Sequence, residues 1–357
     1  MILRTLNLVH RWLGGCIGLV LALLGLTGTI LLWKTAWIGL PHSDDVQRTD
    51  VASIAAATGR ILADSPGQAG SIIYASENFG LHELRLVAGG GQYANQDGAP
   101  VTAWATQWER PEQWIFDLHH HLFTGDLGET VAGVAGLSAL MFIISGAILW
   151  WRTRRTFRFR LWPKRLSRAA ILMHHRDLGI IVAPLLLLTV VTGTMMIFRP
   201  FAALIVGPFS PPSEVVAAIT PPPLRGGLLA QQPNWQAMFT AARSRFPDAE
   251  FRILAIPRRP GDVIFLRMRR AAEWLPNGRT LVAFDAASGR LIYSRDALAM
   301  PMGAQIFNAA YPIHSAKVGG LGYRLVMTLS GLAMMLLGTL TVWSFWFRRK
   351  RHSIATG

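Results

Sequence analysis

Four long stretches of the chain are almost entirely apolar. They cover residues 12–33, 131–151, 178–198 and 325–347. A helix crosses the hydrocarbon core of a bilayer with roughly 20 predominantly apolar residues, and each stretch has about that length. The pattern therefore predicts a mainly α membrane protein with four transmembrane helices.

Two polar segments, residues 34–128 and 200–322, separate these helices in pairs. Short apolar runs in the second segment predict a β-meander at residues 251–256, 263–268, 281–284 and 290–293. A short helix is expected over residues 234–246, with Asn234 as its N-cap. Weaker strand patterns occur in the first segment, at 71–74 and 81–87, with a turn at 96–98; proline clusters at 211–212 and 221–223 predict loops. Each polar segment is thus expected to form a small α+β domain.

A five-residue phrase occurs twice, each time at the start of an apolar stretch. It reads His10-Arg11-Trp12-Leu13-Gly14 and His175-Arg176-Asp177-Leu178-Gly179. Eighteen residues after each histidine comes the glycine of a Thr-Gly pair, Gly28 and Gly193. A shift of 195 positions places His119 on His314, ahead of the second helix of each half. The chain is therefore expected to be a tandem duplication of helix, small extracytoplasmic α+β domain and helix.

Charge gives the expected orientation. The formal net charge is +15, although only 15% of residues are charged, against about 25% in soluble domains. The excess lies in three segments: residues 152–176, the tail at 348–351, and the N-terminus with Arg4 and Arg11. All three fall on one side of a four-helix topology, as the positive-inside rule requires. Both termini are expected in the cytoplasm, and the distribution argues against nucleic-acid binding.

The expected boundaries follow from these patterns. The first half comprises a cytoplasmic N-terminus and helix (1–33), a periplasmic domain (34–128) and a second helix (129–151). A basic cytoplasmic loop (152–174) leads to the second half. That half comprises a helix (175–199), a second periplasmic domain (200–322), a helix (323–347) and a basic cytoplasmic tail (348–357).

The histidines of the two repeats fall into two pairs. In this topology His10 and His175 lie at the cytoplasmic ends of their helices, and His119 and His314 lie at the opposite surface. Ionisable side chains at membrane depth are costly and usually functional, and neutral imidazole is a common axial ligand of haem iron. Two pairs at two surfaces predict two bis-histidine haem b groups. Because Cys16 is the only cysteine, these would be held non-covalently.

Several assignments near these pairs stay open. His120 or His121 could replace His119, because neighbouring residues on a helix point in different directions. Arg11 and Arg176 could bind haem propionates through charge-assisted hydrogen bonds, or could be ordinary basic anchors at the membrane surface.

A stripe of glycines on the first helix has two interpretations. Gly14, Gly18, Gly25 and Gly28 fall within about 80° of His10 on a helical wheel. The stripe could leave room for a porphyrin plane beside the ligand, or it could be a face on which helices pack closely. With a histidine at the head of the stripe, the porphyrin interpretation is preferred.

Several motifs resemble those of a known family. They are His10-Arg11-Trp12-Leu13-Gly14 leading to Gly25-Leu26-Thr27-Gly28, the stretch from Leu118-His119 to Gly125, Trp150-Trp151 followed by arginines, and the residues between Pro257 and Gly289. In these motifs the chain resembles the PepSY-associated transmembrane family of bacterial inner-membrane proteins. That family includes iron-regulated membrane proteins and ferric-siderophore reductases.

The resemblance implies an oxidoreductase of the inner membrane that acts on metal ions. It would reduce a ferric siderophore, Fe(III) to Fe(II), at the periplasmic face, with His10, His119, His175 and His314 as ligands of haem iron. The sequence lacks a dinucleotide-binding G-x-G-x-x-G turn, so an external quinol or reductase is expected to supply electrons. Two alternatives stay open: a haem-free regulator that binds a partner such as a peptidase, and a metal or small-molecule permease.

Overall fold

The computed structural model describes residues 1–346, and the chain divides into two compact units. One unit comprises Met1–Leu32, Ile115–Ala202 and the chain from Ile313 onward. It contains four helices long and apolar enough to cross a membrane: α1 (Ile2–Leu32), α5 (Asp126–Trp151), α6 (Arg168–Ile197) and α11 (Gly320–Trp346). The four predicted membrane helices are therefore present. The tail at 348–357 lies outside the described residues.

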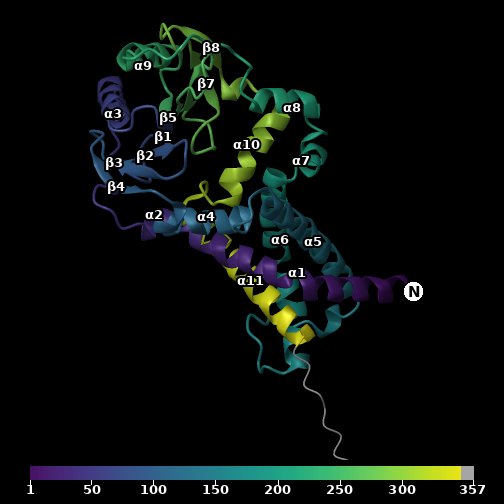
Figure 1. Cartoon of the computed structure of the whole chain (residues 1–357). Helices are drawn as coiled ribbons and strands as arrows, with labels where there is room; N and C mark the ends of the chain where they lie inside the picture. The colour runs from purple at the N-terminus through teal and green to yellow at the C-terminus, as the bar shows by residue number, and fades with distance from the viewer. Residues whose placement is uncertain (347–357) are drawn as a thin grey trace, which may run out of the picture. The chain divides into compact units, whose positions relative to one another are not determined.

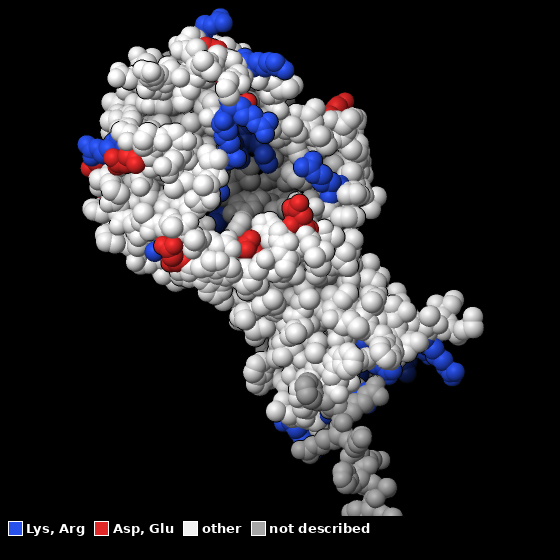
Figure 2. Space-filling view, viewed as in Figure 1, with Lys and Arg blue, Asp and Glu red and all other residues white. Residues whose placement is uncertain are grey.

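These helices form a bundle in which α1 and α6 each contact α5 and α11. In Figure 1, α1 and α11 run side by side. The part of Figure 2 that shows the helices has a broad surface without charged side chains, with Lys and Arg gathered at one end. An apolar belt of this kind is what a bilayer core requires of the groups that face it.

The glycines of α1 explain the close packing against α11. A Cβ on Gly25 would lie 2.6 Å from the carbonyl oxygen of Gly331, and one on Gly18 would lie 3.2 Å from that of Gly338. A Cβ on Gly14 would contact Thr341 at 3.3 Å. Small residues let helix backbones approach in membranes. The preferred porphyrin interpretation is therefore wrong for Gly14, Gly18 and Gly25, which form a helix-packing face.

The third apolar stretch belongs to a longer helix than its hydropathy predicted. Helix α6 begins at Arg168, and the side chain of Ser167 accepts a hydrogen bond from the Ala170 amide as its N-cap. His175 consequently lies two turns inside the helix. The basic residues at 168–176 led to the prediction of a loop that continues to residue 174. Long cationic side chains are, however, compatible with a helix that emerges from a membrane.

The second unit comprises Trp33–Trp114 and Ala203–Pro312. Its eight strands form one antiparallel sheet in the order β4-β3-β2-β1-β5-β6-β7-β8. The strands are β1 (Ala69–Ile73), β2 (His82–Leu86), β3 (Gly91–Ala94), β4 (Pro100–Trp104), β5 (Glu250–Ala255), β6 (Ile264–Arg269), β7 (Thr280–Phe284) and β8 (Leu291–Arg295). Each half of the chain supplies a four-strand meander, and the pairing of Ile72 with Leu254 joins them.

Helices α3 (Val51–Ala63) and α9 (Trp235–Arg245) cover one face of this sheet. Both pack into the main core, where Ile61, Phe239, Leu254, Leu266 and Val282 are fully or almost fully buried. Asn234 caps α9 by accepting a hydrogen bond from the Ala237 amide, as predicted. The predicted strands are confirmed in both segments. Whether the two halves are copies of one unit stays a prediction.

The shorter elements are α2 (Lys34–Trp37), α4 (Pro111–His121), α7 (Arg199–Val206), α8 (Pro212–Ile219), α10 (Met302–His314), and the 3-10 turns Gln107–Glu109, Arg154–Thr156 and Ala297–Ala299. Pro212 begins α8, so the first proline cluster starts a helix, whereas Pro221–Pro223 lie in a loop as expected. Proline suits the first turn of a helix because its missing N–H is not needed there.

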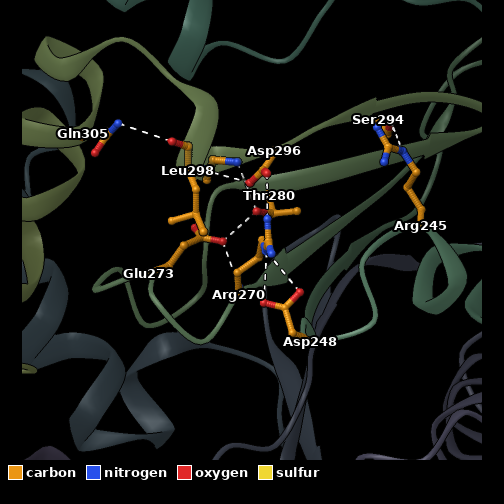
Figure 3. A network of polar contacts seen from close by, with 10 residues as sticks. Arg245, Asp248, Arg270, Glu273, Thr280, Ser294, Asp296, Leu298 and Gln305 are labelled. Carbon is orange, nitrogen blue, oxygen red and sulfur yellow. Dashed lines mark hydrogen bonds and ion pairs between the residues drawn. The ribbon is translucent and has the colours of Figure 1, made fainter.

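A polar network holds the connection between β6 and β7 (Figure 3). The guanidinium of Arg270 bonds Asp248 at 3.1 Å and Asp296 at 2.7 Å. The carboxylate of Glu273 accepts from the Thr280 hydroxyl at 2.7 Å and from the Arg270 amide at 2.9 Å. These hydrogen bonds and ion pairs hold the loop against the ends of β7 and β8.

Candidate functional site

The structure brings His10 of α1 and His175 of α6 together. Their ring centroids are 6.2 Å apart, and the rings are nearly perpendicular, at 80°. Nδ1 of His10 lies 2.7 Å from Oγ of Ser145 on α5, and Nδ1 of His175 lies 3.0 Å from Oγ1 of Thr341 on α11. All four helices of the bundle thus contribute to this pair.

His119 and His314 form a second pair with the same spacing. They lie near the ends of the short helices α4 and α10, and their ring centroids are 6.3 Å apart. Nδ1 of His119 lies 2.9 Å from Oγ1 of Thr27 on α1. Nδ1 of His314 lies 3.0 Å from the carbonyl oxygen of Thr189 on α6, with Oγ1 of Thr192 at 3.4 Å.

The hydrogen bond to a backbone carbonyl determines the tautomer of His314. The Thr189 carbonyl can only accept, so Nδ1 of His314 must donate, which leaves Nε2 of the neutral ring with a free lone pair. The hydroxyls of Ser145 and Thr27 also lie within hydrogen-bond distance of the carbonyl oxygens of Met141 and Leu23. When each hydroxyl donates to that carbonyl, Nδ1 of His10 and of His119 donates to the hydroxyl oxygen in the same way.

A histidine that binds a metal usually has this arrangement, because the hydrogen bond at one ring nitrogen orients the other. Burial, reinforced by His314 and His120, lowers the pKa of His119 to about 3, so this ring is neutral at physiological pH. Imidazole nitrogens bind first-row metals at about 2 Å, and two rings on opposite sides of one metal then have centroids roughly 6 Å apart. Both pairs have this separation.

A cavity adjoins the second pair. His119, His120, His314, Gly193 and Met334 are among its lining residues, and it contains about 620 Å³ of unfilled space, part of it open to the surroundings. Its other lining residues are mostly apolar. A mostly apolar lining with a few polar groups is typical of small-molecule and cofactor sites.

The repeated Thr-Gly pairs both serve this histidine pair. A Cβ on Gly28 would lie 3.0 Å from Cε1 of His119, and one on Gly193 would lie 2.8 Å from Cε1 of His314. Each glycine leaves room for an imidazole ring, while the preceding threonine hydroxyl lies near Nδ1 of the same ring. The two glycines therefore accommodate the imidazole rings, and the porphyrin interpretation of Gly28 stays a prediction.

A tight connection between α4 and α5 positions His119. Leu122 and Phe123 adopt left-handed backbone conformations, with φ of 47° and 61°. A Cβ on Gly128 would overlap the carbonyl oxygen of His121, so only glycine allows this approach.

The other candidate residues have different surroundings. His120 lines the cavity and stacks on Phe116, with centroids 4.2 Å apart, and Nδ1 of His121 lies 2.9 Å from the Asp117 carboxylate. Arg176 bonds Asp177 and Thr156, and Arg11 is exposed. A role for either arginine at a haem propionate stays a prediction.

Sequence reasoning missed the polar partners of the histidines and one buried carboxylate. Ser145, Thr189 and Thr341 lie far from the histidines in sequence, so no local motif marks them. Asp177 is fully buried, and ion pairs of 2.7 Å link it to Arg160 and Arg176. Its place inside the repeated phrase, next to two basic residues, was the available signal.

The bundle and its histidines define a membrane protein with two pairs of neighbouring imidazole rings. Among residues 1–346, no group of three or more His, Cys, Asp or Glu is placed to hold a metal ion, so these imidazoles occur as pairs. The model of the PepSY-associated TM region matches residues 8–349, and the chain belongs to that family. A comparison with curated proteins gives no match.

Proposed function

We propose that this protein is a dihaem b-type electron-transfer protein that reduces a ferric siderophore. The observation that carries the proposal is the geometry of the two histidine pairs. Both have centroid separations of 6.2–6.3 Å, and the hydrogen bonds given above run through Nδ1 in all four rings. His10 with His175, and His119 with His314, would each hold one haem.

The residues present fit this cofactor. A bis-histidine haem would be held by two neutral imidazoles and would need an apolar slot for its macrocycle. When bound, haem iron accepts and passes on one electron at a time. The protein's own contribution is to hold the rings: Ser145, Thr27 and Thr189 fix their orientation, and Gly28 and Gly193 leave space for two of them.

The direction of electron flow and the substrate are inferred from the family resemblance and from the distribution of basic residues. The proposal places the protein in the bacterial inner membrane with both termini in the cytoplasm, because the basic segments lie at one end of the topology. A quinol or a separate reductase would supply electrons. One electron converts Fe(III) in the chelate to Fe(II), which a siderophore holds weakly and therefore releases at the periplasmic face.

An anaerobic re-oxidation experiment tests this function. The purified full chain, supplied with haem during expression, is reduced with dithionite, freed of reductant and mixed with ferrioxamine B or ferric citrate. The reduced haem bands are expected to disappear, with one Fe(II) trapped by ferrozine for each electron lost. His119→Ala should slow this step strongly.

Bands that stay reduced with both chelates would contradict the reductase. Protein that contains no haem would favour the haem-free regulator of a partner such as a peptidase. The described residues do not support the alternative of a permease, because paired imidazoles at two places in the bundle do not outline a transport path.

A further inference from the structure

Three arginines gather on one side of the sheet in the second unit. Arg267 lies on β6, Arg279 directly precedes β7, and Arg295 ends β8. Arg267 pairs with Leu281, and Leu281 pairs with Arg295 on the next strand. Directly paired residues point to the same face, and neighbouring strands are about 4.8 Å apart. Arg267 and Arg295 therefore flank Leu281 on one face.

This face is the one that α3 and α9 leave free. Leu266, Met268 and Val282, the sequence neighbours of Arg267 and Leu281, point into the core under those helices, so alternation directs Arg267 to the opposite side. The three charges also affect one another. Burial, and then the charge of Arg279, lowers the pKa of Arg267 to about 10, and burial followed by Arg295 lowers that of Arg279.

The hydrogen bonds of these arginines go to neutral oxygens. Arg267 donates to the Gly278 carbonyl, Arg279 donates to Oδ1 of Asn308 at 3.1 Å, and Arg295 donates to the Thr220 carbonyl at 2.9 Å. Nε of Arg267 and Nε of Arg295 are buried and have no partner among the described residues. A buried donor without a partner is costly, and a bound anion would supply the acceptor that each of these donors needs.

The nearby carboxylates are already engaged elsewhere. Asp248 and Asp296 bind Arg270, and Glu273 accepts from the Thr280 hydroxyl and from the amides of Arg270 and Arg279 (Figure 3). Within the described part of the chain, Glu273 is the acid whose charge acts on both Arg267 and Arg279. Arg267 and Arg279 therefore share one carboxylate that already has hydrogen-bond donors, and the cluster of three guanidinium groups keeps an excess of positive charge.

We propose that Arg267, Arg279 and Arg295 form a binding site for an anionic, carboxylate-bearing ligand. Guanidinium groups bind carboxylates through paired, charge-assisted hydrogen bonds, and several such groups on one face suit a ligand with several carboxylates. Resting on the proposed function, this site makes the preferred substrate an anionic ferric chelate of the citrate type over a cationic hydroxamate chelate.

Binding of a redox-inert analogue tests the site without any electron transfer. Ga(III)-citrate, Ga(III)-desferrioxamine B, citrate and inorganic phosphate are each titrated into the purified full chain by calorimetry. Arg267→Gln and Arg295→Gln remove one charge each, and Arg267→Lys keeps the charge but loses the planar donor fork. Arg290→Gln is the matched control, because Arg290 lies exposed at the turn end of the same β7–β8 hairpin.

We expect Ga(III)-citrate to bind the native chain and to bind Arg267→Gln and Arg295→Gln at least about tenfold more weakly, the loss of one charge-assisted contact. The affinity of Arg267→Lys for Ga(III)-citrate should lie between those of the native chain and of Arg267→Gln. Arg290→Gln should bind it as tightly as the native chain does. Failure of Ga(III)-citrate to bind, or equal weakening by Arg290→Gln, overturns the site. Citrate or phosphate alone binding as tightly as the chelate overturns the assignment of a chelate. Normal haem bands together with no binding would reject this site and leave the proposed function standing.

Discussion

Nδ1 of His119 lies 2.9 Å from the hydroxyl oxygen of Thr27, and the next residue, Gly28, leaves the space that the imidazole ring occupies. The same relationship recurs between His314 and the pair Thr192-Gly193. A Thr-Gly pair in a membrane helix therefore supplies both a hydrogen-bond partner and room for a ring. The two dipeptides follow His10 and His175 at equal distances but contact the other two histidines, so α1 and α6 each contribute to both histidine pairs.

Alanine at Gly28 or Gly193 is expected to disturb the second histidine pair alone. The added Cβ would lie 3.0 Å from Cε1 of His119, or 2.8 Å from that of His314, so the ring must move. On the proposed function, each variant should lose about one of two haems while the His10/His175 site keeps its own. Haem extraction and quantification per chain measures this.

Gly179→Ala is the matched control for these variants, because nothing lies within 4 Å of a Cβ at that position on α6. It should keep the full haem content. Equal losses in all three variants would show that the effect is a general weakening of the helices.

Asp177→Asn is expected to release the segment between α5 and α6. The buried carboxylate binds the guanidinium groups of Arg160 and Arg176, and accepts from the Arg158 amide at 3.3 Å. Breaking a buried ion pair costs up to about 3–5 kcal/mol, and a loss of only about 1.4 kcal/mol already makes trypsin cleave at residues 152–168 about tenfold faster, so at least that increase is expected. Asp126→Asn makes the same charge change at an exposed position and should cleave as the native chain does. An unchanged rate for Asp177→Asn would contradict this role.

His82 is expected to make the second unit sensitive to acid. Burial lowers the pKa of His82 to about 4, against about 6.5 in an unfolded chain. As pH falls from about 6.5 to about 4, the unfolded state takes up a proton that the folded state does not, so the free energy of unfolding decreases. The decrease can reach about 3 kcal/mol at 1.36 kcal/mol per pKa unit.

His82→Asn should flatten this pH dependence. Its amide oxygen can replace Nδ1, which accepts from the Ala75 amide at 3.0 Å, and it does not titrate. Thermal midpoints of the detergent-solubilised chain at pH 7 and pH 5 make the comparison, with His42→Asn, at an exposed position, as the control. A thermal midpoint of the native chain that is the same at pH 5 as at pH 7 would rule out the effect.

The orientation is tested by a reporter enzyme fused after Gly357. The positive-inside distribution predicts cytoplasmic activity for this fusion. A fusion after Gly67, in the turn before β1, should report the periplasm. The reverse pattern would invert the proposed direction of electron flow.

Local patterns were sufficient for much of this fold. The length of the apolar stretches identified α1, α5, α6 and α11, and alternation identified the strands from β5 to β8. The pairing of β1 with β5 was not accessible, because Ile72 and Leu254 are far apart in sequence and no local signal links them. The predicted start of α6 at residue 175 was wrong because the basic residues before it were assigned to a loop, whereas the helix begins at Arg168 after the N-cap Ser167.

The candidate site could likewise be predicted from the sequence only in part. The histidine pairs follow from repeats and topology, so the sequence grouped His10 with His175 and His119 with His314. The role of the glycines could not be predicted from the sequence, because a Gly-rich face packs equally well against a helix, a ring or a flat ligand. Only the neighbours of Gly25 and Gly28 show that the first contacts α11 and the second contacts His119.

The most direct test of the central claim is the reduced absorption spectrum of the purified chain, with haem counted per protein. The native chain should contain two six-coordinate b-type haems, and His10→Ala and His175→Ala should each lose the same one. His119→Ala and His314→Ala should each lose the other. A chain without haem when haem supply is secured, or a full complement in the four single variants, would contradict the account.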